Sequence, residues 1–388
     1  MIDLSLLICN AKVYDSEHKE FFDGSVLTEQ DRIVCVSRDP APLEPDGATV
    51  VDAEGRMLIP GLVDIHTHGR AGGDFNTADD SLMIKMAKSY LSSGVTAVMP
   101  TLASATLDEL TASVERINTL RCVEGSLPYV IGVHLEGRYL NPSKRGAHAP
   151  ELLCALDADE LENIINRIHG EKHISAALEL DTDGSFLRRA LELGATVGLG
   201  HTAADFATAT KLINSGVTTM THLFNAMPPL HHRDGGAVAA GLLGSAYCEL
   251  ICDGFHIAPE MVKMAYRLLK DDDRLVLITD SMEATDCADG EYTIAGMPVT
   301  VKDGKARTHD GAIAGSTLTL LDGVKNLTDF AEIPFEDALY CATLAPARAV
   351  GISDELGSIE KGKRADMLLL DKDFRIQLIV CGGEKVKF

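Results

Sequence analysis

Four histidines and two carboxylates are the residues whose types and spacing could do chemistry. His66 and His68 stand two residues apart at the end of one apolar run, and Glu136, His201, His222 and Asp280 lie at or near the ends of others. Imidazole and carboxylate groups together are ligands for zinc, iron and similar divalent ions. Residues i and i+2 of a strand point to the same side, so His66 and His68 could bind one ion together. The spacing therefore predicts a metal-dependent active site.

The remaining members of this set could form a second metal position and supply the catalytic base. His201 and His222 come from neighbouring runs and could reach another metal position, with Glu136 between the two as a bridge. Asp280 could act as the base beside a water molecule, whose pKa a metal ion lowers to about 7. A single histidine is more often a surface or core residue than a ligand, but several at successive strand ends favour one shared site. His18, His169 and His309 fit no such pattern and are interpreted as solvated.

The elements that must position these side chains alternate along residues 59–349. The strand candidates are 62–66, 95–100, 129–136, 173–180, 195–201, 217–223, 247–253 and 274–280. The helix candidates between them are 81–94, 107–120, 159–168, 185–194, 206–216 and 259–270. Eight successive strand–helix units predict an α/β fold, a (β/α)8 TIM-type barrel with its catalytic groups at the C-terminal mouth. An open doubly wound sheet is the alternative, but no GxGxxG turn supports it.

The two ends of the chain have a different pattern. Residues 1–58 and 350–388 consist of short β-type runs broken by turns, which predicts one small β-sandwich domain formed by both ends around the barrel domain of residues 59–349. After the eighth strand, residues 291–323 indicate a hairpin around Lys302–Lys305 and then a glycine-rich loop. Insertions at this end of a barrel usually build the substrate site.

Composition limits the partners and the compartment. The 388 residues carry a formal charge of −23, which opposes binding to nucleic acid or to anionic membranes, so an anionic substrate would need local cations. The nine cysteines contain no CxxC pair, which is typical of reduced thiols in the cytosol. The first residues have no basic segment of a signal peptide, and no apolar run approaches the roughly 18–20 residues of a membrane span. We expect a soluble, cytoplasmic protein.

Several motifs carry a resemblance that covers nearly the whole chain. They are PGLVDIHTHG (60–69), VHLEG (133–137), KRGAH (144–148), GHTAAD (200–205), THLFNAMPPLHHR (221–233), DGFHIAP (253–259), ITDSM (278–282), DGAIAGSTLTL (310–320) and KGKRADMLLLD (361–371). With them the chain resembles the amidohydrolase superfamily and, within it, the N-acetylglucosamine-6-phosphate deacetylases. The first and last motifs occur widely in the superfamily, whereas NAMPPL and GAH are narrower and favour the deacetylases.

The resemblance implies roles for individual residues. Glu136, His201 and His222 would be the shared metal ligands, and His66 and His68 would bind a second ion that only some members possess. One or two divalent ions per subunit are implied, zinc first, with iron, manganese or cobalt as alternatives. Asp280 would be the catalytic acid and base, and His148 would donate a hydrogen bond to the developing oxyanion. Substrate contacts are implied for Ala147, His148, Asn225, Ala226, Arg233, His256, Ile313, Ala314, Gly315 and Ser316.

The implied reaction is hydrolysis of N-acetylglucosamine-6-phosphate to glucosamine-6-phosphate and acetate. Arg233 would be the phosphate-binding cation, in a homodimer whose Arg233 loop leans on the partner subunit. Two departures stand out: Arg138 replaces the proline of the usual EGP, and residues 177–179 are ALE instead of APE. Arg138 would add a cation near the mouth, which leaves substrate preference within the class open.

Three alternatives remain at this point. One is a deacetylase of a different N-acetylhexosamine-6-phosphate. Another is a cyclic-amide or N-acyl hydrolase similar to dihydroorotase; such enzymes often bridge two metals with a modified lysine, whereas none of the strand candidates ends in lysine. The third is a non-catalytic protein that keeps the barrel. The retention of the whole ligand set together with Asp280 argues against it.

Overall fold

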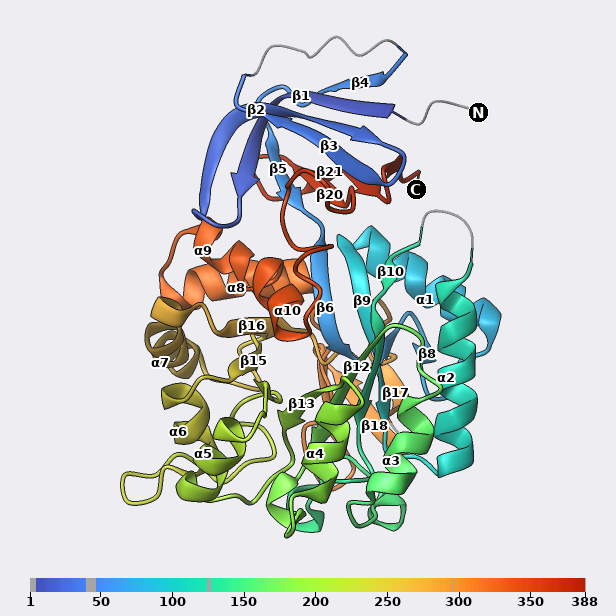
Figure 1. Cartoon of the computed structure of the whole chain (residues 1–388), viewed down its shortest axis with the longest axis vertical. Coiled ribbons are helices and arrows are strands. Elements are labelled where there is room, and N and C mark those ends of the chain that lie inside the picture. The colour runs from blue at the N-terminus through green and yellow to red at the C-terminus, as the bar shows by residue number, and fades with distance from the viewer. Residues whose placement is uncertain (1–4, 40–46, 124–126, 295, 388) are drawn as a thin grey trace.

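A parallel β-barrel wrapped by helices forms most of the molecule, and a separate sheet lies at one end of it (Figure 1). The computed structural model describes residues 5–39, 47–123, 127–294 and 296–387. The barrel strands are β6 (Leu62–Thr67), β9 (Val95–Ala103), β10 (Tyr129–Val130), β11 (Gly132–Glu136), β12 (Glu171–Ala176), β13 (Thr196–Leu199), β14 (Thr219–Met220), β15 (Tyr247–Ile251) and β16 (Leu275–Ile278).

These strands run parallel in the order in which the chain makes them, with β6 beside β9 and with β10 and β11 as two parts of one strand. Beyond the paired residues, the backbone N–H of Asp280 donates to the carbonyl of His66 at 2.9 Å, which brings the last strand back to the first. The barrel is therefore nearly closed, and the predicted fold class is confirmed.

Helices cover the outside of the barrel. They are α1 (Asp80–Ser92), α2 (Leu107–Arg121), α3 (Ala158–Ile165), α4 (Ser185–Glu192), α5 (Phe206–Asn214), α6 (Gly236–Leu243), α7 (Pro259–Leu269), α8 (Leu320–Ala331), α9 (Phe335–Tyr340) and α10 (Leu344–Ala349). Side-chain caps begin several of them: Asp79 accepts from the N–H of Leu82, and Thr106 and Glu109 form a capping box at the start of α2. No helix in the described part of the chain is both long and apolar enough to cross a membrane.

The interior of the barrel is unusually polar. Branched apolar side chains normally fill the inside of such barrels, but here Asp64, His66, His134, His173 and Glu249 are all buried on the barrel strands. They bond to one another or to buried hydroxyls; for example, Nε2 of His134 lies 2.8 Å from Oγ of Ser175. The core below the strand ends is thus a hydrogen-bonded layer that can hold polar side chains above it in fixed positions.

The two chain ends meet in one mostly antiparallel eight-stranded sheet, at the top of Figure 1. Its strands are β1 (Ser5–Asp15), β2 (Glu20–Glu29), β3 (Arg32–Ser37), β4 (Thr49–Asp52), β5 (Met57–Pro60), β20 (Met367–Leu370), β21 (Ile376–Cys381) and β22 (Glu384–Lys385). Strand β5 joins the halves, because it pairs in parallel with β1 and antiparallel with β20. The domain limits at residues 58 and 350 stay a prediction; the ranges 1–58 and 350–388 include residues outside those described.

Two small sheets sit at the C-terminal side of the barrel strands. They consist of β7 (Gly69–Arg70) with β8 (Gly73–Asp74), and of β17 (Gly290–Ile294), β18 (Met297–Lys302) and β19 (Lys305–Thr308). The second contains the hairpin predicted around Lys302–Lys305. Its turn residues Asp303 and Gly304 have φ of 52° and 68°, the left-handed pair that a two-residue hairpin turn uses.

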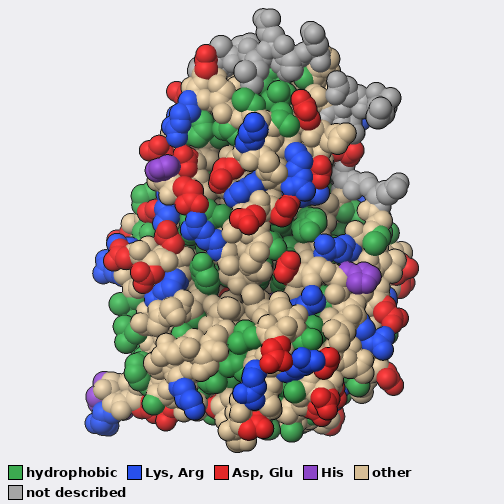
Figure 2. Space-filling model, viewed as in Figure 1, with side chains coloured by type: hydrophobic (Ala, Val, Ile, Leu, Met, Phe, Trp, Pro, Cys, Tyr) green, Lys and Arg blue, Asp and Glu red, His purple; other side chains and the backbone are tan. Residues whose placement is uncertain are grey.

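Charged side chains of both signs are mixed on the surface. On the face shown in Figure 2, Asp and Glu side chains are interspersed with Lys and Arg. On this face the acidic side chains are therefore not gathered in one area. Any cation that recruits an anionic substrate has to act locally.

Candidate active site

Three of the candidate residues lie just beyond strand ends in a left-handed backbone conformation. The φ angles are 47° for His201, 30° for His222 and 47° for Asp280. Such a conformation costs a residue other than glycine about 1–3 kcal/mol and is concentrated at functional sites. Neighbouring backbone bonds hold it in place; at Asp280 the N–H donates to His66 O and the carbonyl accepts from Ser316 N at 2.8 Å. The turn points each side chain into the mouth of the barrel.

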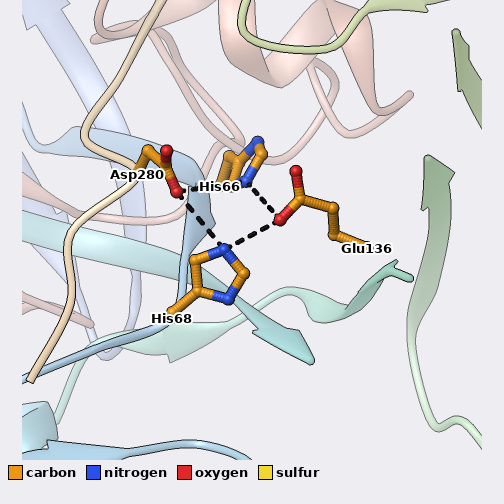
Figure 3. Close-up of side chains that lie close together, drawn as sticks. All are labelled: His66, His68, Glu136 and Asp280. Atoms are coloured by element: carbon orange, nitrogen blue, oxygen red, sulfur yellow. Dashed lines mark ion pairs between the residues drawn. The ribbon is translucent and has the colours of Figure 1, made fainter. Parts of the chain in front are cut away.

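Glu136, at the end of β11, lies between two pairs of histidines. Its Oε1 is 3.2 Å from Nε2 of His201 and 2.8 Å from Nε2 of His222. Its Oε2 is 2.9 Å from Nε2 of His68 and 3.4 Å from Nε2 of His66, as Figure 3 shows. One carboxylate therefore joins two groups of potential ligands, which is the bridging position expected from the sequence.

Asp280 completes the group shown in Figure 3. Its Oδ1 lies 3.3 Å from Nε2 of His68 and 3.5 Å from Nε2 of His66. In each of the two sets, His66, His68, Glu136 and Asp280 or Glu136, His201 and His222, the donor atoms lie within 4.8 Å of one another and all the residues are buried.

These residues fit a divalent metal ion. Burial alone would lower the pKa of His68, but the hydrogen bonds that it donates to Asp280 and Glu136 raise that pKa to about 9. The same carboxylates would favour a bound cation in place of the proton. In addition, Nε2 of His66 is buried without a hydrogen-bond partner among the described residues. A buried nitrogen that faces two carboxylates is the donor that zinc and similar ions take.

His148 presents one nitrogen to the site. Its Nδ1 accepts the backbone N–H of Ser104 at 3.3 Å, so the ring proton of the neutral form lies on Nε2, 3.9 Å from Oε2 of Glu136. Burial, together with the nearby His201, lowers the pKa of His148 to about 3. The ring is therefore a neutral donor directed into the site, which suits the oxyanion contact expected of it.

One pocket of about 370 Å³ opens onto these groups. It is lined by His68, Glu136, Ser143, Lys144, Gly146, Ala147, His148, His201, His222, Asn225, Ala226, His256, Asp280, Ile294, Ile313, Ala314 and Gly315. The structure thus brings together most of the candidate residues, from loops far apart in the sequence. His66 lies beneath the pocket floor, fully buried.

Besides His66, two candidate residues do not line this pocket. Ser316 is buried behind it, where its hydroxyl donates to the carbonyl of Thr279 at 2.5 Å. Arg233 is exposed on the loop between β14 and α6, which projects from the molecule beyond α5 and α6 at the lower left of Figure 1. Within one chain, Arg233 does not line the pocket.

Arg138 does not add a cation at the mouth. Its guanidinium pairs with Glu160, with Nε 3.0 Å from Oε1, and donates to the carbonyl of Ala105 at 3.0 Å. The side chain does not line the pocket. The arginine that replaces the usual proline is thus engaged in a local ion pair. Among the described residues that line the pocket, Lys144 alone is a lysine or an arginine.

Sequence reasoning missed several supporting residues. Ser104, which fixes the His148 ring, belongs to none of the motifs, and Asp253, whose Oδ2 lies 2.7 Å from Nδ1 of His256, begins the motif DGFHIAP, but the resemblance implied no role for it. Glu249 had a signal: it is a charged residue inside the apolar strand YCELI, and a buried carboxylate requires partners. Those partners turn out to be residues of the site.

A nearly closed parallel barrel with imidazoles and carboxylates at its C-terminal mouth defines a metal-dependent hydrolase of the barrel type. The sequence profile of the amidohydrolase family matches residues 57–386. The chain belongs to this amidohydrolase family.

Several of the similar proteins are sugar-phosphate deacetylases. An N-acetylglucosamine-6-phosphate deacetylase of Vibrio furnissii is 36% identical, over 82% of this chain and 80% of that one. An N-acetylgalactosamine-6-phosphate deacetylase of Escherichia coli O157:H7 is 34% identical, over 90% and 92%. The structure of a mutant Mycobacterium smegmatis N-acetyl-D-glucosamine-6-phosphate deacetylase, in complex with N-acetyl-D-glucosamine-6-phosphate, superposes with a TM-score of 0.87 at 28% identity, over 98% and 99%.

Proposed function

We propose that this enzyme hydrolyses the acetamide bond of N-acetylglucosamine-6-phosphate, giving glucosamine-6-phosphate and acetate. The observation that carries the proposal is a single pocket lined by ligands of both metal groups, by Asp280 and by the Nε2 face of His148. The deacetylases similar to this chain supply the substrate class.

A divalent ion held by these residues would act as a Lewis acid, polarising the acetyl carbonyl and making water a better nucleophile at neutral pH. Asp280 then accepts the proton of the attacking water and passes it to the departing amine, since its carboxylate is at the pocket surface beside the ligands. His148 donates from Nε2 to the carbonyl oxygen as negative charge develops there. The C–N bond breaks, and acetate and the free amine leave.

The ion we propose is zinc, with iron, manganese or cobalt as alternatives. Zinc is supported by the ligand chemistry, four imidazoles with carboxylates. We propose that the enzyme works in the cytoplasm. All nine cysteines are free thiols in the structure, as is usual in a reducing compartment.

The test of the function is acetate release from a panel of N-acetylhexosamine 6-phosphates, with metal content measured on the same sample. We expect the gluco compound to be used best. The galacto compound is the second candidate, because one of the similar relatives is an N-acetylgalactosamine-6-phosphate deacetylase. Dihydroorotate belongs in the panel too; turnover of dihydroorotate without acetate release would replace the proposal by a cyclic-amide hydrolase.

Phosphate recognition is proposed to require a homodimer. Arg233 is exposed and lies outside the pocket of its own chain, on a loop that also exposes Leu230 (40%), and Phe206 (41%) at the start of α5 is exposed beside it. Exposed apolar side chains around a cationic loop are typical of an interface. A loop of this kind in one subunit could deliver its guanidinium to the partner's pocket.

We expect Arg233→Ala to lower kcat/KM for the 6-phosphate by about ten- to a hundredfold, because it removes one charge-assisted contact. The unphosphorylated sugar, already a poor substrate, should be almost unaffected. The matched control is Arg188→Ala, which removes an exposed arginine on α4. An equal fall for both sugars would show that Arg233 is structural, and Lys144 would become the phosphate candidate.

Mixed dimers test whether Arg233 acts across the interface. Refolding or co-expressing Arg233→Ala chains with Asp280→Asn chains gives hybrids in which one site has both wild-type groups if the arginine comes from the partner. About a quarter of all sites should then be active. If the arginine served its own chain, the mixture would gain nothing over the two parents.

A further inference from the structure

Glu249 is a fully buried carboxylate that the mechanism does not use. It lies on β15, between the apolar residues Cys248 and Leu250, and its side chain is 0% exposed. Burying a carboxylate is costly unless hydrogen bonds compensate it. The partners that compensate it are therefore informative about its purpose.

One oxygen of Glu249 contacts both groups of metal ligands. Its Oε2 lies 3.0 Å from Nδ1 of His66 and accepts the backbone N–H of His222 at 3.2 Å. The backbone carbonyl of Glu249 also accepts the N–H of Leu223 at 2.8 Å. The left-handed turn at His222 is thus attached to β15 on both sides of the histidine side chain.

The contact with His66 fixes which ring nitrogen is free. A carboxylate oxygen accepts, so Nδ1 of His66 carries the proton and donates to Glu249. Nε2 is then left with its lone pair, and this is the atom directed at Glu136 and Asp280. In the opposite tautomer, Nε2 would carry a proton toward the site and could not bind an ion.

The second oxygen of Glu249 is buried and has no hydrogen-bond partner among the described residues. Oε1 of Glu249 lies 3.6 Å from Nε2 of His173, whose Nδ1 is 2.8 Å from Oγ1 of Thr196. Within the described part of the chain, the hydrogen bonds of the Glu249 side chain are therefore all made by Oε2, to His66 and to the backbone of His222, so the position of the carboxylate is defined by its contacts with the ligand groups.

We propose that Glu249 is the positioning residue of the metal centre, which sets the tautomer and orientation of His66 and holds the backbone of His222. The inference rests on the metal-dependent function proposed above. What it adds is that the acceptor position of Oε2 determines how tightly metal is bound.

The experiment compares three substitutions that separate acceptor position from charge. Glu249→Leu removes both. Glu249→Gln removes the charge but can keep a carbonyl oxygen where Oε2 lies. Glu249→Asp keeps the charge but draws the acceptor back by one methylene. Ser175→Ala is the control, since Ser175 is also buried in the barrel interior and its hydroxyl is hydrogen-bonded to His134 and Thr221 and not to a side chain of the two ligand groups, although its backbone pairs with that of Glu136.

Metal affinity is measured by competition with a chelator, the cobalt-substituted proteins are compared by their absorption spectra, and kcat and KM are measured separately. We expect metal affinity to fall about 10- to 100-fold for the leucine and aspartate variants and much less for glutamine and for Ser175→Ala. The cobalt spectrum should change in the same two variants, and activity should fall through kcat with little change in KM.

The proposal would be overturned if Glu249→Gln lowered metal affinity as much as Glu249→Leu, or if Glu249→Asp bound metal as tightly as the wild type. Either result would show that the charge, and not the position of the acceptor, determines metal affinity. If the leucine variant does not fold, the glutamine–aspartate comparison alone decides. The metal measurements need no substrate, so they stand or fall separately from the deacetylase activity.

Discussion

Replacing Asp280 with asparagine is expected to lower kcat by about 10²–10⁴-fold while metal content stays near that of the wild type. The amide cannot accept the proton of the attacking water or return it to the amine. Asparagine also tolerates the left-handed backbone at this position, where φ is 47°, so the fold should be undisturbed. The measurement is acetate release under saturating substrate, with elemental analysis of the same preparation.

The control for this variant is Asp286→Asn. Asp286 is another left-handed aspartate nearby, with φ of 64°, but it pairs with Arg70 and does not line the pocket. The same chemical change there should leave kcat within a few-fold of wild type. An Asp280→Asn enzyme that kept more than about a tenth of its activity would show that another group moves the proton. A variant without metal would instead identify Asp280 as an indispensable ligand.

Glu136→Gln is expected to remove metal from both groups and to abolish turnover. Glu136 offers one oxygen to His201 and His222 and the other to His66 and His68. A glutamine has only one oxygen, and its amide nitrogen would present protons to the remaining group. The change therefore affects both positions at once. Elemental analysis and a chelator titration measure the loss, and added zinc should not restore activity.

Single-histidine variants show how the two groups differ. His201→Ala or His222→Ala should lose the ion bound by Glu136, His201 and His222, whereas His66→Ala should lose at most the second ion, which His66 and His68 would bind. Glu179→Gln is the matched control for Glu136→Gln. Glu179 also lies near the site, where it accepts N–H groups of Asn141 and Ala203, but it belongs to neither ligand group. A Glu136→Gln protein with full metal content would refute the bridging role, and a metal-free His66→Ala protein would reverse the assignment of the groups.

The barrel is predictable because its strands carry a strong signal. Strand β9 is buried at all nine positions and is mostly apolar, as expected for a barrel strand with helices on its outer face and the barrel interior on its inner face. Helix α2 is equally clear, with its capping box and amphipathic spacing. The site residues at the ends of such strands can be grouped from the sequence alone, because all strands of the barrel end at one mouth.

Other features give no usable signal. Helix α6, GAVAAGLL, has no polar face and two glycines, so it lacks the periodicity that identifies a surface helix, and the helix candidates do not include it. The distances within the metal groups depend on the left-handed turns at His201 and His222, which a residue type alone does not indicate. Likewise, the position of Arg233 depends on how a loop projects, a property of tertiary structure. The sequence pattern could name these residues but not their geometry.

The pairing of β5 with β20 sets a limit on how this chain can mature on the ribosome. Met57–Pro60 and Met367–Leu370 are hydrogen-bonded neighbours although about 300 residues of chain separate them. At roughly 5–20 residues synthesised per second, one edge of β5 stays unpaired for about 15–60 s until β20 has been made. Vectorial folding can therefore build the barrel early but cannot finish the sheet. During that interval the nascent chain has an open strand edge that a chaperone or another nascent chain could bind.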